Sequence, residues 1–132
     1  MKLINDVILK NNLFQELLKM NAIEYSLDKA SARMKIDESI MTFYGMVYGG
    51  AIFALAEVVS IAASVTNDKS YVTMDSTVKF LNPAYGEYLV AHAEVIYRGE
   101  GNCSVDVVVN DENDTLIAKA MLTMFEIESS AV

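Results

Sequence analysis

The sequence predicts an α+β fold in which one antiparallel sheet wraps around a long buried helix. Residues 49–66 are apolar on nearly every side, and four runs with alternating apolar residues follow between residues 72 and 127. A helix that is apolar all round must be surrounded by protein. The gaps between the last three runs have the length of hairpin turns, which implies antiparallel neighbours. A single sheet curled around a single helix is the simplest arrangement that buries both.

No linker, internal repeat or low-complexity tract interrupts the 132 residues, so we expect a single domain over residues 1–132. An N-terminal helix is expected over residues 1–19, because apolar residues recur there at roughly helical spacing. A break in this helix near Asn11 and Asn12 stays open. Residues 22–36 are predicted to be extended, because apolar and polar side chains alternate from residue 30 onward.

The central helix is expected over residues 49–66, followed by strands at residues 72–81, 87–97, 103–109 and 115–127. Alternation gives each of the first three strands one apolar face, which we assign to the core. These faces carry Val72, Met74, Ser76, Val78 and Phe80 in the first strand, Leu89, Ala91, Ala93 and Val95 in the second, and Cys103, Val105, Val107 and Val109 in the third.

The composition limits the classes of function. Ten basic residues against 18 acidic ones give a net charge of -8, and no cluster of Lys and Arg predicts a nucleic-acid-binding face. Cys103 is the only cysteine, so no intrachain disulfide can form, and it is predicted to be a small core residue. His92 is the only histidine and is predicted to face solvent. We therefore expect neither a metal site nor a cofactor.

The distribution of apolar residues predicts the location of the protein and its oligomeric state. Residues 1–6 do not resemble a signal peptide, and the apolar stretch 45–66 contains Glu57, which favours a buried helix over a membrane span. A cytoplasmic protein without membrane contact is therefore expected. The apolar fraction of 53% also suggests that some surface is buried against another subunit, so we expect a homo-oligomer, either a dimer or a dimer of dimers.

Glu57 is the sharpest candidate for chemistry. A carboxylate in the middle of an apolar helix is costly to bury unless it is hydrogen-bonded or paired. One interpretation is structural: Glu57 lies on a stripe that reaches solvent, or pairs with a lysine. The other is functional: a general base or nucleophile held in a partly apolar cleft.

Gly49 and Gly50 are the second candidate. Residues without side chains let a ligand approach the backbone, and N–H groups at a helix start lack partners within the helix. They can therefore polarise a carbonyl, although simple turning of the chain is an equally good interpretation. Seven residues separate Gly50 from Glu57, which is about 10 Å along the axis. Both can act on one carbonyl if the substrate lies along the helix, if Glu57 acts through a water, or if it comes from a second subunit.

Residues 45–63 resemble the signature of the PaaI-like acyl-CoA thioesterases of the hotdog superfamily. In that family a glycine precedes a His-Gly-Gly, and an apolar run leads to an acidic residue on the central helix; Gly45, Gly49, Gly50 and Glu57 match this pattern. Further matches over residues 72–109 are Thr73, Asp75, Phe80, Pro83, Gly86, Arg98 and Gly99. The resemblance covers about residues 20–126 and implies a hotdog fold, an antiparallel sheet wrapped around a long central helix.

The resemblance also implies roles for individual residues. Glu57 would activate water or attack an acyl-CoA thioester, the Gly50 N–H would polarise its carbonyl, and Tyr48 would orient the substrate. Such sites are typically completed across a dimer interface. Substrate or coenzyme A contacts are expected from further residues, of which Asp75 and Thr77 would come from the partner subunit: Thr42, Gly49, Asp75, Thr77, Asn82, Pro83, Arg98 and Gly99.

Two departures from the family pattern keep an alternative open. Tyr48 stands where the family usually has histidine, and Thr42 stands where many members have asparagine. Tyrosine can donate a hydrogen bond but does not titrate near neutral pH as histidine does. The sequence therefore predicts an acyl-CoA thioesterase, with a non-catalytic protein that binds or senses acyl-CoA as the alternative.

Overall fold

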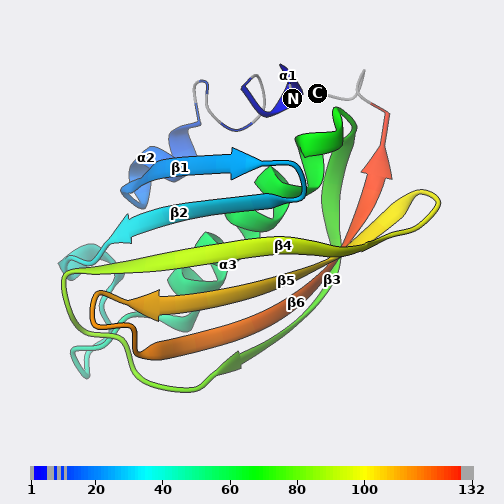
Figure 1. The fold of residues 1–132 in the computed structure, drawn as a ribbon. Helices are drawn as coiled ribbons and strands as arrows, with labels where there is room; N and C mark the ends of the chain where they lie inside the picture. The colour runs from blue at the N-terminus through cyan, green and yellow to red at the C-terminus, as the bar shows by residue number, and fades with distance from the viewer. Residues whose placement is uncertain (1, 6–7, 9, 11, 129–132) are drawn as a thin grey trace.

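The computed structural model describes residues 2–5, 8, 10 and 12–128. Six strands form one sheet with the order β1-β2-β4-β5-β6-β3, and all neighbouring strands are antiparallel. Figure 1 shows this sheet curving around the helix α3. The elements are α1 (Lys2–Ile4), α2 (Leu13–Leu17), β1 (Met20–Ser26), β2 (Lys29–Lys35), η2 (Glu38–Ile40), α3 (Gly49–Ser64), η3 (Val65–Asn67), β3 (Ser70–Phe80), β4 (Tyr88–Arg98), β5 (Asn102–Asp111) and β6 (Leu116–Ile127).

The central helix is the core of the molecule, as the sequence predicts. Leu55, Val59, Ala62 and Ala63 are fully buried. By length and composition Gly49–Asn67 is apolar enough to cross a membrane, but 72% of its most apolar 18-residue window is buried inside the protein. That burial is what the core helix of a folded domain requires, since the sheet supplies its apolar surroundings.

The inner faces of β4 and β5 are confirmed. Alternate side chains of both strands point toward α3 and are at most 8% exposed. His92, between two of these positions on β4, is exposed as predicted. Strict alternation was sufficient here because both strands lie inside the sheet, with one face on the core and one in solvent. The buried residues are Leu89, Ala91, Ala93, Val95, Cys103, Val105, Val107 and Val109.

The single extended segment predicted over residues 22–36 is wrong, since these residues belong to a hairpin of two strands. Ser26 pairs with Lys29, so Leu27 and Asp28 form a two-residue turn. Asp28 adopts a φ of 66°, in the left-handed region that Asp tolerates better than most residues. This turn is not evident from the sequence, because only one of its two residues, Asp28, is a typical turn residue.

The face predicted for residues 72–80 is also wrong in part. The register of β3 on β6 shifts between Thr73 and Asp75, which places a bulge at Met74. A bulge adds one residue and reverses the alternation. Val72 therefore pairs with exposed Phe125 on the outer face, whereas Phe80 pairs with buried Ala118 on the face that holds α3.

The N-terminal segment has two short helices among the described residues. Asn12 is the N-cap of α2, and its side chain accepts a hydrogen bond from the N–H of Gln15 at 3.4 Å. The helix start therefore lies beside the predicted break. Asn12 itself has an extended backbone, so the helix predicted over residues 1–19 does not continue through it. Residues 6–7, 9 and 11 lie outside the described residues.

Candidate functional site

The start of α3 leaves backbone donors without partners. Tyr48 is the N-cap residue, but its side chain makes no capping hydrogen bond. Its carbonyl oxygen accepts from the N–H groups of Ala51 and Ile52, at 3.0 and 3.2 Å. Within residues 12–128 no acceptor lies within hydrogen-bond reach of the N–H of Gly49 or Gly50. A helix start with free N–H groups carries partial positive charge and can bind a carbonyl oxygen or an anion.

The two glycines differ in their surroundings. A Cβ atom on Gly49 would lie 3.1 Å from Cζ of Phe80, whereas a Cβ on Gly50 would have nothing within 4 Å. A side chain at position 49 would therefore have to displace the Phe80 ring slightly, whereas Gly50 faces open space. Of the two, Gly50 is the one that a ligand can approach.

The loop before α3 is held by its own backbone. Met41 and Val47 form a bridge, and the Thr42 N–H donates to the Met46 carbonyl at 2.6 Å. The Thr42 hydroxyl accepts from the N–H of Tyr44 at 3.2 Å, so this side chain has a local structural role. Tyr48 follows the loop as the residue before α3 and is 56% exposed.

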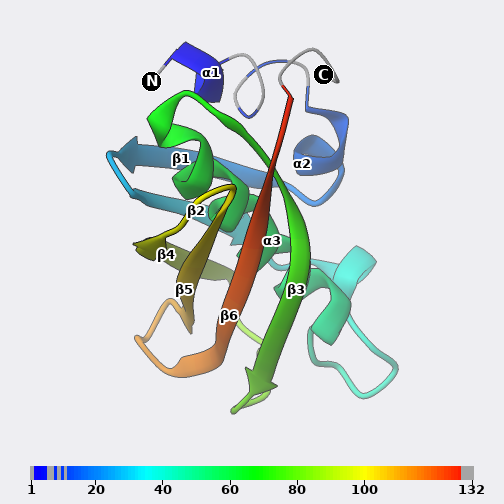
Figure 2. The same ribbon diagram turned by 90° about the vertical axis from the view of Figure 1, so that its right-hand side faces the viewer.

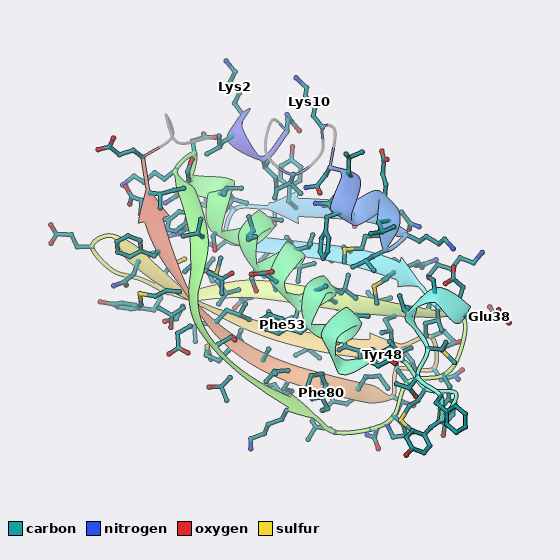
Figure 3. The ribbon with its side chains drawn as sticks, turned by 180° about the vertical axis from the view of Figure 1, so that it is seen from behind. Lys2, Lys10, Glu38, Tyr48, Phe53 and Phe80 are labelled. Carbon is teal, nitrogen blue, oxygen red and sulfur yellow. The ribbon has the colours of Figure 1, made fainter. Side chains whose placement is uncertain are left out.

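Glu57 lies on the least buried stripe of α3. Phe53, Glu57 and Ile61 are four residues apart and partly exposed, which places them on one side of the helix. Figure 3 shows α3 from this open side, with Tyr48 at its start and Phe53 along it. Within the described part of the chain, Glu57 makes no hydrogen bond or ion pair. The lysine partner considered as one interpretation is therefore not found among the described residues, whereas the stripe that carries Glu57 does reach solvent.

Asn82 and Pro83 lie at the same end of the molecule as Gly50. The Val47 N–H donates to the Ala84 carbonyl at 2.8 Å, which joins their loop to the segment before α3. Both residues are exposed, and the Asn82 amide donates to the Leu116 carbonyl at 2.8 Å. The structure thus brings these two predicted contacts close to the start of α3.

Arg98 and Gly99 lie at the opposite end of α3, about 20 Å from Gly50 along a helix of 16 residues. The Arg98 guanidinium donates to Asp28 at 2.9 Å, to the Ser64 carbonyl at 3.1 Å and to the Tyr71 hydroxyl at 3.3 Å. It is therefore committed to holding the end of α3 in its own chain. The contact with coenzyme A predicted for Arg98 and Gly99 stays a prediction.

Asp75 and Thr77 are on the outer face of the sheet, because they pair with Thr123 and partly exposed Met121. Sequence reasoning missed Thr73 on the inner face, where it pairs with fully buried Met124. The Thr73 hydroxyl is buried and has no hydrogen-bond partner among the residues that the structure describes. Buried polar groups are rarely left unpaired, so Thr73 is a candidate site residue. The bulge at Met74 hid it, because simple alternation puts residues 73, 75 and 77 on one face.

Other features of the described residues lie away from this site. A depression of about 440 Å³ is open on the outer face of the sheet, where Glu24, His92 and Asp106 contribute to its lining. Within residues 2–5, 8, 10 and 12–128, no three His, Cys, Asp or Glu side chains are placed to hold a metal ion. Burial raises the pKa of the Cys103 thiol, which is typical of a structural cysteine.

A curled antiparallel sheet around one long helix, with a glycine pair at the helix start, is a hotdog fold. The sequence profile of the thioesterase superfamily matches residues 44–118, more than half of the chain, and the chain belongs to that family. The Escherichia coli PaaI protein of the phenylacetic acid degradation operon has a similar structure, with a TM-score of 0.89 and 19% identity, covering 96% of this chain and 92% of that protein.

Two further proteins are similar to this chain. A Streptococcus mutans protein solved with acetyl-CoA has a TM-score of 0.79 and 24% identity, covering 83% of this chain and 89% of its own. A protein of Archaeoglobus fulgidus, provisionally named an esterase, is 26% identical over 125 residues, which are 94% of this chain and 81% of the relative. These comparisons support a function of the thioesterase type.

Proposed function

We propose that this protein hydrolyses acyl-CoA thioesters, with Glu57 as general base or nucleophile and the Gly50 N–H polarising the carbonyl. One observation carries the proposal. Within residues 12–128, the same helix presents an N–H without an acceptor at its start and a carboxylate without a partner on its open side. Thioester hydrolysis needs both functions, since negative charge develops on the carbonyl oxygen while water or a carboxylate attacks the carbon.

The separation of these two groups favours a site shared between subunits. Gly50 and Glu57 are about 10 Å apart along one helix, too far to act directly on one carbonyl carbon. A homodimer would allow Gly50 of one protomer to work with Glu57 of its partner. The edge strand β3 favours such a dimer, because Val72, Met74 and Phe80 leave 43 to 59% of their surface exposed beside unpaired backbone groups.

The ligand is proposed to be an acyl-CoA. The Streptococcus mutans neighbour contains acetyl-CoA, and its fold is the fold of this chain. Thr42, Gly49, Asn82 and Pro83 surround the start of α3 and are proposed to line the approach of the thioester. Since the net charge is -8, the phosphates of coenzyme A must be met by local donors rather than by an overall positive field.

Non-catalytic binding of acyl-CoA remains the second candidate, because Tyr48 replaces the usual histidine and the Thr42 hydroxyl is engaged by Tyr44. Both candidates are tested by mixing the pure protein with a panel of acyl-CoAs and following thiol release and binding separately. Release supports the enzyme. Binding without release supports the sensor, and the absence of both rejects the proposal.

The decisive variant is Glu57→Gln, which keeps the size of the side chain but cannot accept a proton. General-base catalysis contributes about 10²–10⁴-fold, so thiol release should fall by at least that factor while acyl-CoA affinity and the melting temperature stay nearly unchanged. Glu94→Gln is the matched control, because Glu94 is exposed on β4 and pairs with Lys29. Full thiol release by Glu57→Gln would make Glu57 structural.

Sedimentation at micromolar concentration tests the dimer, and a monomer would reject the shared site.

A further inference from the structure

Phe80, the last residue of β3, lies against the first turn of α3. Its backbone partner Ala118 is buried, so both side chains face α3. A Cβ at position 49 would lie 3.1 Å from Phe80 Cζ and 3.4 Å from both Cε atoms, so the tip of the ring points at Gly49. Figure 3 shows Phe80 and Tyr48 near the start of the helix. The ring occupies the space that a side chain at position 49 would fill.

Phe80 is nevertheless 50% exposed, and Gly49 is followed directly by Gly50, whose N–H has no acceptor within residues 12–128. A carbonyl oxygen accepting from that N–H would lie about 2.9 Å from the nitrogen, and a C=O bond adds about 1.2 Å. The carbonyl carbon would then lie within about 4 Å of the Gly50 nitrogen. Adjacent Cα atoms are about 3.8 Å apart, so a group attached to that carbon reaches the surroundings of Gly49, where the ring lies.

The apolar surface continues from the ring along α3. Gly49 and Phe53 are four residues apart and therefore lie on the same side of the helix, and Glu57 follows at the same spacing. Phe80 over Gly49 and the partly exposed Phe53 are therefore apolar groups on the same side of α3 as Glu57. A phenyl ring offers no hydrogen bond to the amides of the coenzyme A arm, whereas burying hydrocarbon against it is favourable.

We propose that Phe80 is the wall of the acyl pocket and sets the size of the acyl group that the site accepts. This inference rests on the proposed function, because it places the thioester carbonyl at Gly50. The two glycines then have separate roles. Gly49 leaves room for the Phe80 ring, which limits the size of the acyl group. Gly50 leaves room for the thioester carbonyl to approach its N–H.

The test compares Phe80→Ala and Phe80→Leu with Phe125→Ala. Phe125 is a matched control, since it is 49% exposed against 50% for Phe80 and lies on the opposite face of the sheet. Each variant is assayed with acyl-CoAs from two to twelve carbons. One methylene in an apolar pocket changes discrimination by about 10-fold or more, so Phe80→Ala should raise the long-to-short ratio of kcat/KM at least 10-fold. Phe80→Leu should raise it less, and Phe125→Ala should leave it unchanged.

Gly49→Ala provides the opposite change, because its methyl group would push the ring toward the ligand. It should lower the long-to-short ratio, and Phe80→Ala in the same chain should abolish that decrease. If Phe80→Ala does not fold, Phe80→Leu and Gly49→Ala decide the question. An unchanged ratio in active variants would overturn the inference and make Phe80 a packing residue.

Failure of the inference about Phe80 can be distinguished from failure of the proposed function. If the native protein binds acyl-CoA without releasing thiol, the same ratio is measured from the Kd values by calorimetry. A shift in those Kd values supports Phe80 even when catalysis is absent, and equal Kd ratios in all variants overturn it. A native protein that binds no acyl-CoA would reject both proposals.

Discussion

The two ends of α3 are built in opposite ways. At the C-terminal end, the carbonyl oxygens of Ala63 and Ser64 accept from the Arg98 guanidinium, at 3.4 and 3.1 Å. At the N-terminal end, the N–H groups of Gly49 and Gly50 have no acceptor within residues 12–128, and no side chain caps the helix. Figure 2 shows α3 with the sheet curved around it. The closed end stabilises the fold, whereas the open end keeps donors available for a ligand.

The two ends of α3 also differ in the charged groups that lie beside them. A cation beside the last turn of a helix interacts favourably with its dipole, and Arg98 provides one. The positive end of the same dipole carries no acidic residue in its first turn. A ligand oxygen that becomes negative during thioester hydrolysis would meet that unneutralised end. We therefore expect substitutions at the closed end to change stability and substitutions at the open end to change activity.

The largest effect on stability is expected from Arg98→Ala. Hydrogen bonds to charged groups contribute about 1.5–3 kcal/mol, and partial exposure of the side chain keeps the loss near 2 kcal/mol. The melting temperature should fall by about 5–10 °C, with thiol release little changed well below it. Arg98→Lys should recover only part of the lost stability, because the ammonium group of lysine cannot reproduce the planar set of N–H donors of a guanidinium. Arg33→Ala, at an exposed arginine stacked on Tyr88, is the control. Loss of activity in folded Arg98→Ala would break the comparison.

Gly50→Ala should separate stability from activity at the open end. Nothing lies within 4 Å of the added methyl, and alanine favours a helix over glycine by up to about 1 kcal/mol. Cβ atoms point toward the helix N-terminus, so the methyl would obstruct the approach to the Gly50 N–H. We expect an unchanged or raised melting temperature with about a 10-fold lower kcat/KM. Equal activity in Gly50→Ala would place the carbonyl elsewhere.

Tyr48 should give a smaller, graded effect. Tyr48→His restores the residue of the family pattern. Thiol release should rise by up to about 10-fold, because a weak hydrogen-bond donor is replaced by a side chain that titrates near neutral pH. Tyr48→Phe removes the hydroxyl alone. A several-fold loss in kcat/KM would show that the phenol is used, whereas unchanged kinetics would make the ring a packing surface.

The smallest effect is expected at Cys103, whose sulfur lies 3.5 Å from the Ser64 hydroxyl at the closed end. Burial raises the pKa of this thiol in the folded state. Above about pH 8.5 the unfolded thiol loses its proton while the folded one keeps it, so stability decreases as the pH rises. Denaturation in urea should show a loss below about 1 kcal/mol between pH 8 and 9. Cys103→Ala should lose this pH dependence, and an identical slope would assign it to other groups.

The sequence by itself determined the parts of this protein that depend on local pattern. Residues 49–66 are apolar all round, and a helix with that pattern has to be enclosed. Residues 87–97 and 103–109 alternate strictly, so their inner faces followed directly. Glu57 was recognisable from residue type alone, because a charge within an apolar helix is exceptional. The glycine pair was a weaker signal, because simple turning of the chain explains two adjacent glycines equally well.

Only the tertiary structure decided the features that depend on residues distant in sequence. Phe80 is 31 positions from Gly49, and Arg98 is 34 from Ser64, so neither contact leaves a periodic signal. The bulge at Met74 placed Thr73 on the inner face and Asp75 on the outer face, since one extra residue reverses the alternation that sequence reasoning relies on. The separate roles of Gly49 and Gly50 arise in the same way, because what surrounds a glycine is set by the strand that packs beside it.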